Sequence, residues 1–153
     1  MGIKLSTELV SAIKNKKTAK ALATSNEDGS PILIFSPDLH IDENGDLVHL
    51  ELLESSATNK NLVRGIWFDK KVSVSVRTPE GREWSITGAP IKMHVSGPLF
   101  QKYYVETSLH YGEADLAAAW VIRPESENEE TYSVKLREQD IEHPFFRHLD
   151  RLA

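Results

Sequence analysis

The sequence predicts a mainly β protein, a small β-barrel with short helices. Three observations predict this fold class. Apolar and polar residues alternate over several short runs, Asp-Gly and Asn-Gly pairs separate such runs, and helical periodicity is confined to short segments. About six strands are expected, and they should be mostly antiparallel because tight turns join them. The 153 residues fit one domain over residues 1–153.

The first expected element is a helix over residues 4–17, and the barrel should follow over about residues 18–136. Ser6 or Thr7 can cap the start of this helix. One face of the helix carries four apolar residues, namely Leu5, Leu9, Ala12 and Ile13.

The first strand pair is expected in "ALATSNEDGSPILIF", where Asp28-Gly29 is a hairpin signal. The second strand of the pair does not alternate, because it contains Ile32, Leu33, Ile34 and Phe35 in succession. A strand that is apolar on both faces has to be covered on both faces. A helix or another subunit should therefore pack outside the sheet here.

A second hairpin is expected in "DENGDLVHLELL", with its turn at Asn44-Gly45. Val48, Leu50 and Leu52 should point to one face of the strand, and His49 and Glu51 to the other. The same letters place oxygen-bearing side chains at several positions of a calcium-binding loop, but the first position is a histidine and the flanks are strand-like. A hairpin turn explains them, and no metal site is predicted.

The later strands differ in how clear their patterns are. "KKVSVSVR" alternates throughout, whereas the run from Trp84 to Val95 changes phase at Gly88-Ala89-Pro90, which suits a bulge or bend. "LFQKYYVETSLHYG" favours a helix, and "TYSVKL" favours a strand by alternation. "LAAAWVIRP" is ambiguous, because alanine favours helix and Trp-Val-Ile favours strand.

A closing helix is expected over about residues 143–152. Its apolar side would carry Phe145, Leu149 and Leu152.

Composition excludes several classes of function. The chain has no cysteine, which excludes disulfides, thiolate metal sites and cysteine nucleophiles. Its net charge of −5 gives no electrostatic reason to expect nucleic-acid binding, and no apolar run reaches the roughly 18 residues that a transmembrane helix needs. We expect a cytoplasmic protein without a membrane partner.

Motifs for catalysis by side chains alone are also absent. The sequence has neither a Gly-rich phosphate loop nor a Gly-x-Ser-x-Gly elbow. No catalytic residue is therefore predicted, and if the protein is an enzyme, a cofactor should carry the reaction.

One polar stretch, "SSATNKNLVR", allows two interpretations. It can simply start a helix, with Ser56 or Thr58 as the cap, Leu62 facing inward, and Asn61 and Arg64 facing water. It can also bind an anion, since a helix N-terminus that carries hydroxyls and a lysine suits a phosphate. The two interpretations are compatible.

Three stretches in this order resemble the pyridoxamine 5′-phosphate oxidase-like family of FMN-binding split barrels. They are "ALATSNEDGSPILIF", "LVHLELLESSATNKNLVRGIWFDKKVSVSV" and "WSITGAPIKM", and the resemblance covers about residues 18–136. It implies a six-stranded antiparallel split barrel of Greek-key type that forms a homodimer with two FMN molecules at the interface.

The resemblance also implies where FMN would bind. The phosphate would lie at the turn that carries Ser55, Ser56, Thr58, Asn59 and Lys60. The isoalloxazine ring would lie along the strand of Ile32, Leu33, Ile34 and Phe35, with help from the partner subunit. A tryptophan such as Trp84 could approach the ring, although the pattern favours a core or dimer role for each tryptophan.

Departures from the family pattern leave the reaction open. A basic residue is common three positions before the Asn-Leu pair, and here that position is Thr58. The Arg-plus-Lys arrangement and the Gln-Ser pair of the pyridoxamine phosphate oxidases are missing, which argues against that reaction. The first hypothesis is an FMN-dependent oxidoreductase that performs two-electron redox on a small substrate. The alternative is a non-catalytic dimer that binds haem, a nucleotide or another small ligand, and a deazaflavin could replace FMN.

Overall fold

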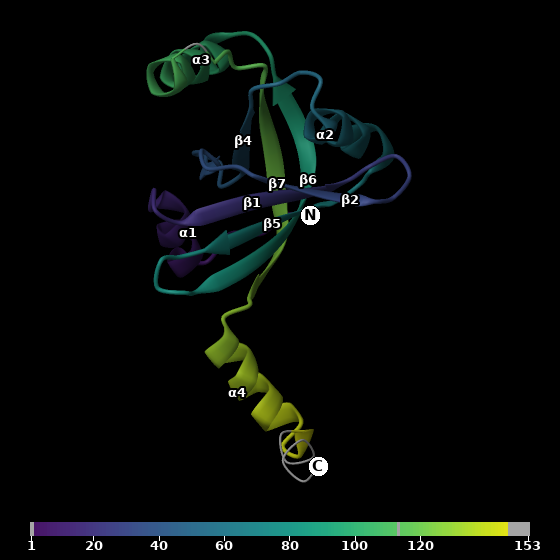
Figure 1. The fold of residues 1–153 in the computed structure, drawn as a ribbon, viewed down its shortest axis with the longest axis vertical. Helices are drawn as coiled ribbons and strands as arrows, with labels where there is room; N and C mark the ends of the chain where they lie inside the picture. Colours follow the sequence, from purple (N-terminus) through teal and green to yellow (C-terminus); the bar gives the residue numbers. More distant parts are fainter. Residues whose placement is uncertain (1, 113, 147–153) are drawn as a thin grey trace.

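The computed structural model describes residues 2–112 and 114–146 (Figure 1). The described strands are β1 (Ala19–Ser25), β2 (Pro31–Phe35), β3 (His40–Ile41), β4 (Leu47–Glu51), β5 (Val72–Arg77), β6 (Glu83–His94) and β7 (Ala118–Glu129). The described helices are α1 (Thr7–Lys14), α2 (Ala57–Phe68), α3 (Pro98–Tyr111) and α4 (Tyr132–Glu142).

The strands form one antiparallel sheet in the order β2-β1-β5-β6-β7-β4-β3. The sheet is curved into a half-barrel, so the predicted fold class is confirmed. The described residues contain seven strands, however, and the expectation of six was wrong. The shortest strand is β3, the first strand of the expected second hairpin, in which His40 and Ile41 pair with Val48 and Leu47.

Both predicted hairpin turns are present. The Asp28-Gly29 turn joins β1 to β2, and the Asp28 carboxylate accepts a hydrogen bond from the Ser30 N–H at 2.9 Å. The Asn44-Gly45 turn joins β3 to β4, and Asp42 Oδ1 accepts from the N–H groups of Asn44 and Asp46. Asp42 therefore stabilises a turn, in agreement with the hairpin interpretation of this loop.

The expected irregularity in the long strand is also confirmed. The pairing of β6 with β7 shifts register between Thr87 and Gly88 and again between Pro90 and Lys92. Gly88 allows a close approach, because a Cβ atom there would lie 2.8 Å from the carbonyl oxygen of Arg123. The two shifts bend β6 and β7, and the sheet curves around its core.

The main core fills the inside of the curved sheet. It contains the inward side chains of β1, β5, β6 and β7, together with the apolar face of α1, where Leu9, Ala12 and Ile13 are buried as predicted. Ser6 caps α1 by accepting from the Leu9 N–H at 3.3 Å. A second, smaller cluster lies beneath α3, around Val48 and Tyr103.

Two expectations near the C-terminus need correction or completion. "TYSVKL" is the start of α4 and not a strand. The alternation of apolar and polar residues in it does not correspond to a buried face, since no residue of α4 is buried. The ambiguous "LAAAWVIRP" lies in β7, where pairing with both β4 and β6 overrides the helix preference of alanine.

The closing helix expected over 143–152 falls largely outside the described residues. In its described part, His143 is the C-cap of α4, a turn covers residues 144 and 145, and Phe146 is helical. In the part of the chain that is described, no helix is long and apolar enough to cross a membrane.

Candidate functional site

The predicted anion site is the start of α2, which packs against β1, β2 and β6 (Figure 1). Ser56 is the N-cap, and its Oγ accepts from the Asn59 N–H at 2.9 Å. Thr58 was the other proposed cap, but it lies inside the helix and is only 3% exposed. The first N–H groups of a helix have no partner within the helix, so those of Ala57 and Thr58 are oriented to attract an anion.

Two asparagines at this turn attach α2 to the barrel. Asn59 Oδ1 accepts from Trp120 Nε1 at 2.8 Å, and Asn59 Nδ2 donates to the Glu54 carbonyl at 3.0 Å. Asn61 Nδ2 donates to Thr24 Oγ1 and to Asn26 Oδ1, both at 2.9 Å. Asn61 is buried, and the expectation that it faces water was wrong because Thr24 of β1 and Asn26 of the following turn supply polar partners.

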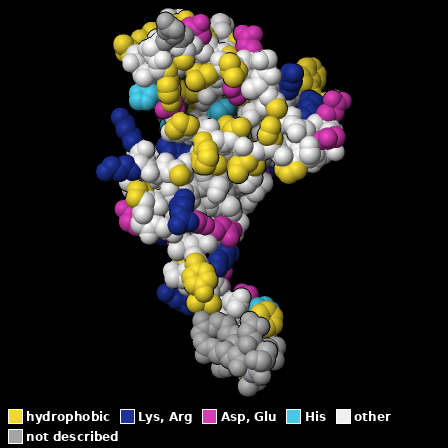
Figure 2. All heavy atoms as spheres, in the orientation of Figure 1, with side chains coloured by type: hydrophobic (Ala, Val, Ile, Leu, Met, Phe, Trp, Pro, Cys, Tyr) yellow, Lys and Arg dark blue, Asp and Glu magenta, His cyan; other side chains and the backbone are white. Residues whose placement is uncertain are grey.

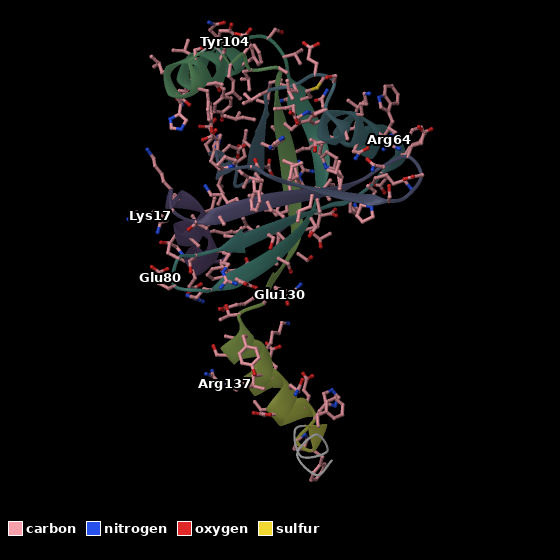
Figure 3. All side chains as sticks on the ribbon, in the orientation of Figure 1. Lys17, Arg64, Glu80, Tyr104, Glu130 and Arg137 are labelled. Carbon is pink, nitrogen blue, oxygen red and sulfur yellow. The ribbon has the colours of Figure 1, made fainter. Side chains whose placement is uncertain are left out.

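A small pocket of about 420 Å³ lies between α2 and the β1–β2 turn. Lys60 and Arg64, one turn apart on α2, both line it, as do Asn26 and Glu27 from the turn. Figure 3 shows Arg64 extending toward the end of this hairpin, where its guanidinium donates to the Ser25 carbonyl at 3.0 Å. Arg64 was expected only to face water, and its spacing of four residues from Lys60 is the signal for a shared site.

Lys60 is the exposed cation of this pocket, and no ion pair of Lys60 is found among residues 2–112 and 114–146. Arg64, by contrast, also donates to Asn61 Oδ1. Figure 2 shows basic and acidic side chains side by side over this region. Glu27 is the acidic member of the lining, so Lys60 and Arg64 leave the pocket with a net positive charge.

Glu51, the last residue of β4, lies next to the start of α2 and contacts residues of the segment that joins them. Its carboxylate accepts from the Leu53 N–H at 3.2 Å and is hydrogen-bonded by His49 and Ser56. Burial by itself raises the pKa of Glu51, but the hydrogen bonds and the charge of His49 outweigh burial and hold this pKa below its usual value. The cap serine is thus fixed by a buried carboxylate.

The strand predicted to contact the flavin ring lies beside α2. Ile34 faces the main core and Ile32 is half-buried, whereas Leu33 and Phe35 are 65% and 76% exposed on the outer face. The core therefore covers one face of β2. Within the single chain, the outer face is open to solvent.

The remaining predicted residues divide between the turn and the core. Ser55 is exposed just before α2, and neither Ser55, Ser56 nor Thr58 lines the pocket. Trp84 is buried at the start of β6, with the Arg82 guanidinium 4.6 Å from its ring centre. The contact of β6 with α2 is at Pro90, six residues and roughly 20 Å along the strand from Trp84, and Trp84 does not line the pocket beside α2.

A larger groove, of about 1400 Å³, lies between α3 and the β3–β4 hairpin, away from the predicted turn. Its wall contains His40 and Tyr103, whose ring nitrogen Nε2 and hydroxyl lie 3.0 Å apart, and His94. Lysines and carboxylates alternate along its lining, which gives no dominant sign of charge. The lining of the smaller pocket, by contrast, has a net positive charge.

Metal ligation has no candidate in the described ranges 2–112 and 114–146. Nowhere in them do three histidine, aspartate or glutamate side chains gather closely enough to hold an ion.

Comparison with known proteins identifies the fold. No family model and no curated protein match the sequence. Among solved structures, HupZ of group A Streptococcus has a TM-score of 0.67 at 14% identity, over 84% of this chain and 95% of that one. A candidate pyridoxamine 5′-phosphate oxidase of Lactobacillus delbrueckii has a TM-score of 0.63 at 21% identity, over 82% and 93%.

An FMN-binding protein of Syntrophomonas wolfei has a TM-score of 0.61 at 14% identity, over 78% of this chain and 82% of its own. These identities are too low to transfer an activity, but the shared architecture covers most of each chain. The protein therefore has the split-barrel fold of the pyridoxamine 5′-phosphate oxidase-like proteins.

Proposed function

We propose that the protein binds FMN and acts as an FMN-dependent oxidoreductase that performs two-electron redox on a small substrate. The observation that carries the proposal is the paired placement of Lys60 and Arg64 in the pocket beside the start of α2. A solved FMN-binding protein with the same fold supports it.

The residues present fit the phosphate end of FMN. Lys60 supplies a compact positive charge and Arg64 a guanidinium that can form two parallel hydrogen bonds. The first N–H groups of α2 add donors close to these cations. The pocket volume lies within the usual range for small-ligand sites.

The ring end of FMN would lie along β2. Leu33 and Phe35 present an apolar surface next to α2, which suits an aromatic ring system. Bound FMN would supply the two-electron chemistry, while these side chains would orient the ring and exclude water from one of its faces. No side chain is assigned a catalytic role.

A homodimer is part of the proposal. Exposed apolar residues of β2 are accompanied by Ile66, Trp67 and Phe68 at the end of α2. Figure 2 shows hydrophobic side chains gathered across the middle of the face that carries β2. A second copy packed there would cover the open face of β2 and enclose the flavin.

The alternative function is ligand binding without catalysis. HutZ of Vibrio cholerae, a haem storage protein, has the same fold with a TM-score of 0.57. His94 lines the groove beside α3 and would be the candidate ligand for haem iron. An F420 reductase has the same fold, so a deazaflavin is an alternative to FMN as the bound cofactor. The absorption spectrum of the purified or reconstituted protein separates flavin from haem.

Titration of Lys60→Ala with FMN tests the phosphate site. Because charge-assisted hydrogen bonds contribute about 1.5–3 kcal/mol, we expect Kd for FMN to rise about tenfold to a hundredfold. The melting temperature without ligand should stay nearly unchanged, since Lys60 is exposed.

Two controls accompany this titration. Lys70→Ala removes an exposed lysine outside the pocket and should bind FMN like the parent. Riboflavin, which lacks the phosphate, should bind weakly to every form. Equal affinity of the parent and Lys60→Ala for FMN would show that the turn is only a helix cap.

A further inference from the structure

Three buried polar side chains form a chain of hydrogen bonds inside the half-barrel. Ser36 Oγ lies 2.7 Å from His49 Nδ1, and His49 Nε2 lies 3.2 Å from Glu51 Oε1. Ser36, His49 and Glu51 are 3%, 4% and 8% exposed, respectively. Buried polar groups in such number need a reason, because each loses its hydration on folding.

The Glu51 carboxylate fixes the direction of one bond. An ionised carboxylate only accepts, so His49 Nε2–H donates to Glu51. The Ser36 hydroxyl bonds Nδ1 at the opposite edge of the ring, and a hydroxyl can donate to a neutral imidazole or accept from a protonated one. The ring is therefore held in one orientation by a partner at each edge.

The chain of bonds continues to the start of α2. Glu51 accepts from the Leu53 N–H at 3.2 Å and from the Ser56 hydroxyl. Ser56 uses its lone pair to accept from the Asn59 N–H. The buried carboxylate is thus hydrogen-bonded directly to Leu53 and Ser56, and through Ser56 Oγ to Asn59.

The other end of the chain lies at the end of β2. Ser36 directly follows Phe35, and its own N–H donates to the Lys20 carbonyl of β1 at 2.9 Å. One buried path therefore joins the strand proposed for the flavin ring to the turn proposed for the phosphate.

We propose that His49 is a positioning residue that holds the start of α2, through Glu51 and Ser56, in the geometry that binds a phosphate. This inference rests on the proposed function for its ligand, but the positioning itself concerns the protein without ligand. His49 touches neither the pocket nor any proposed ligand atom. It sets where the hydroxyl and N–H groups of the turn point.

Histidine is suited to this task because its two ring nitrogens bridge Ser36, just after β2, and Glu51, at the end of β4. Leucine at position 49 would fill a similar volume and leave Glu51 without its His49 bond. Glutamine could still accept from Ser36 and donate to Glu51. His49→Gln should therefore restore much of what His49→Leu loses.

Amide hydrogen exchange of the protein without ligand tests the positioning directly. In His49→Leu, exchange of the Leu53 and Asn59 N–H groups should accelerate about fivefold to tenfold, the effect of weakening one hydrogen bond. His49→Gln should show a smaller change. If His49→Leu does not fold, Ser36→Ala, which frees one edge of the ring, should accelerate the same two amides by a smaller factor.

Tyr103→Phe is the matched control. It removes a different, partly buried hydrogen bond, between Tyr103 of the cluster beneath α3 and His40, at 3.0 Å. This variant should lower stability without accelerating Leu53 and Asn59 selectively. If the His49 and Ser36 variants change these amides no more than Tyr103→Phe does, the proposal is overturned.

Ligand titration then separates the two proposals. The ratio of Kd for riboflavin to Kd for FMN measures the contribution of the phosphate, and His49→Leu should reduce this ratio about tenfold while leaving the riboflavin Kd unchanged. A parent protein that does not prefer FMN would refute the proposed function, and the exchange experiment would still decide the positioning. A parent that prefers FMN, with an equal ratio in His49→Leu, would refute the positioning of a phosphate site.

Discussion

Gly65 shows how one residue sets the distance between α2 and β6. A Cβ atom at this position would lie 2.6 Å from Pro90 Cγ and 3.2 Å from the Lys70 carbonyl oxygen. The proline ring cannot rotate away, so a side chain here would push the helix off the strand. The missing side chain permits the close packing that places α2 beside the β1–β2 turn.

Gly65→Ala should therefore lower the free energy of unfolding by about 1–3 kcal/mol, the usual effect of overpacking. In an exposed helix the same change would raise stability by about 1 kcal/mol. Urea unfolding measures the difference. The loss should shrink in a Pro90→Ala background, and an undiminished loss there would contradict the steric explanation.

The Glu51 carboxylate predicts a pH dependence of stability. Its pKa is raised by burial but lowered further by hydrogen bonds from His49, Leu53 and Ser56 and by the charge of His49, and the net value lies below the ordinary 4.5. Its contribution is fully present above pH 4.5 and is lost as pH falls below 4.5 through the folded-state pKa.

Urea unfolding of Glu51→Gln and the parent between about pH 7 and pH 3 measures this contribution. The stability difference between them should be largest above pH 4.5 and should shrink toward acid. Glu54→Gln, at an exposed neighbouring position, is the control and should follow the parent. A difference that is constant over the whole range would exclude ionised Glu51 as its source.

At the scale of elements, α2 is held to the sheet by amides as well as by Leu62. Asn61 binds Thr24 and Asn26 of the first hairpin, and Asn59 binds Trp120 of β7. Buried amides have fixed donor and acceptor directions, so they define the orientation of the helix more sharply than apolar packing alone.

Asn61→Ala should lower the free energy of unfolding by about 1–3 kcal/mol, because it leaves the buried Thr24 hydroxyl without this donor. Asn128→Ala, an exposed change on β7, should stay within about 0.5 kcal/mol of the parent. Chemical denaturation monitored by tryptophan fluorescence gives both values. Equal midpoints of the two variants would mean that Asn61 does not anchor the helix.

For the whole molecule, the open face of β2 predicts the oligomeric state. We expect a homodimer at micromolar concentration, with Phe35 buried between the copies. Ile34→Asp would place a charge in the main core, because Ile34 packs against the core cluster, so it would not test the dimer interface alone. Phe35→Asp is the informative change, since Phe35 is exposed in the single chain.

Light scattering should find a dimer for the parent and a monomer for Phe35→Asp, because an unpaired charge would be buried in the interface. Leu109→Asp, an equally exposed apolar position on α3, should leave the dimer intact. A stable monomer of the parent at micromolar concentration would rule out this assembly.

Local pattern alone determined the fold class, both hairpin turns and the bend at Gly88, because these follow from period-two alternation and from the conformations that glycine allows. The same reasoning limited the cap of α2 to Ser56 or Thr58, since capping depends on neighbours within one turn, and the structure selects Ser56.

Tertiary structure decided what depends on distant partners. Strand pairing made "LAAAWVIRP" a strand, whereas "TYSVKL" found no partner strand and lies at the start of α4, which has no buried residue. Asn61 and His49 are buried with hydrogen-bonding partners, Thr24 and Ser36, that lie 37 and 13 residues away along the chain. Sequence periodicity records which face a residue lies on, whereas the partner that makes a buried polar group stable is a property of the folded chain.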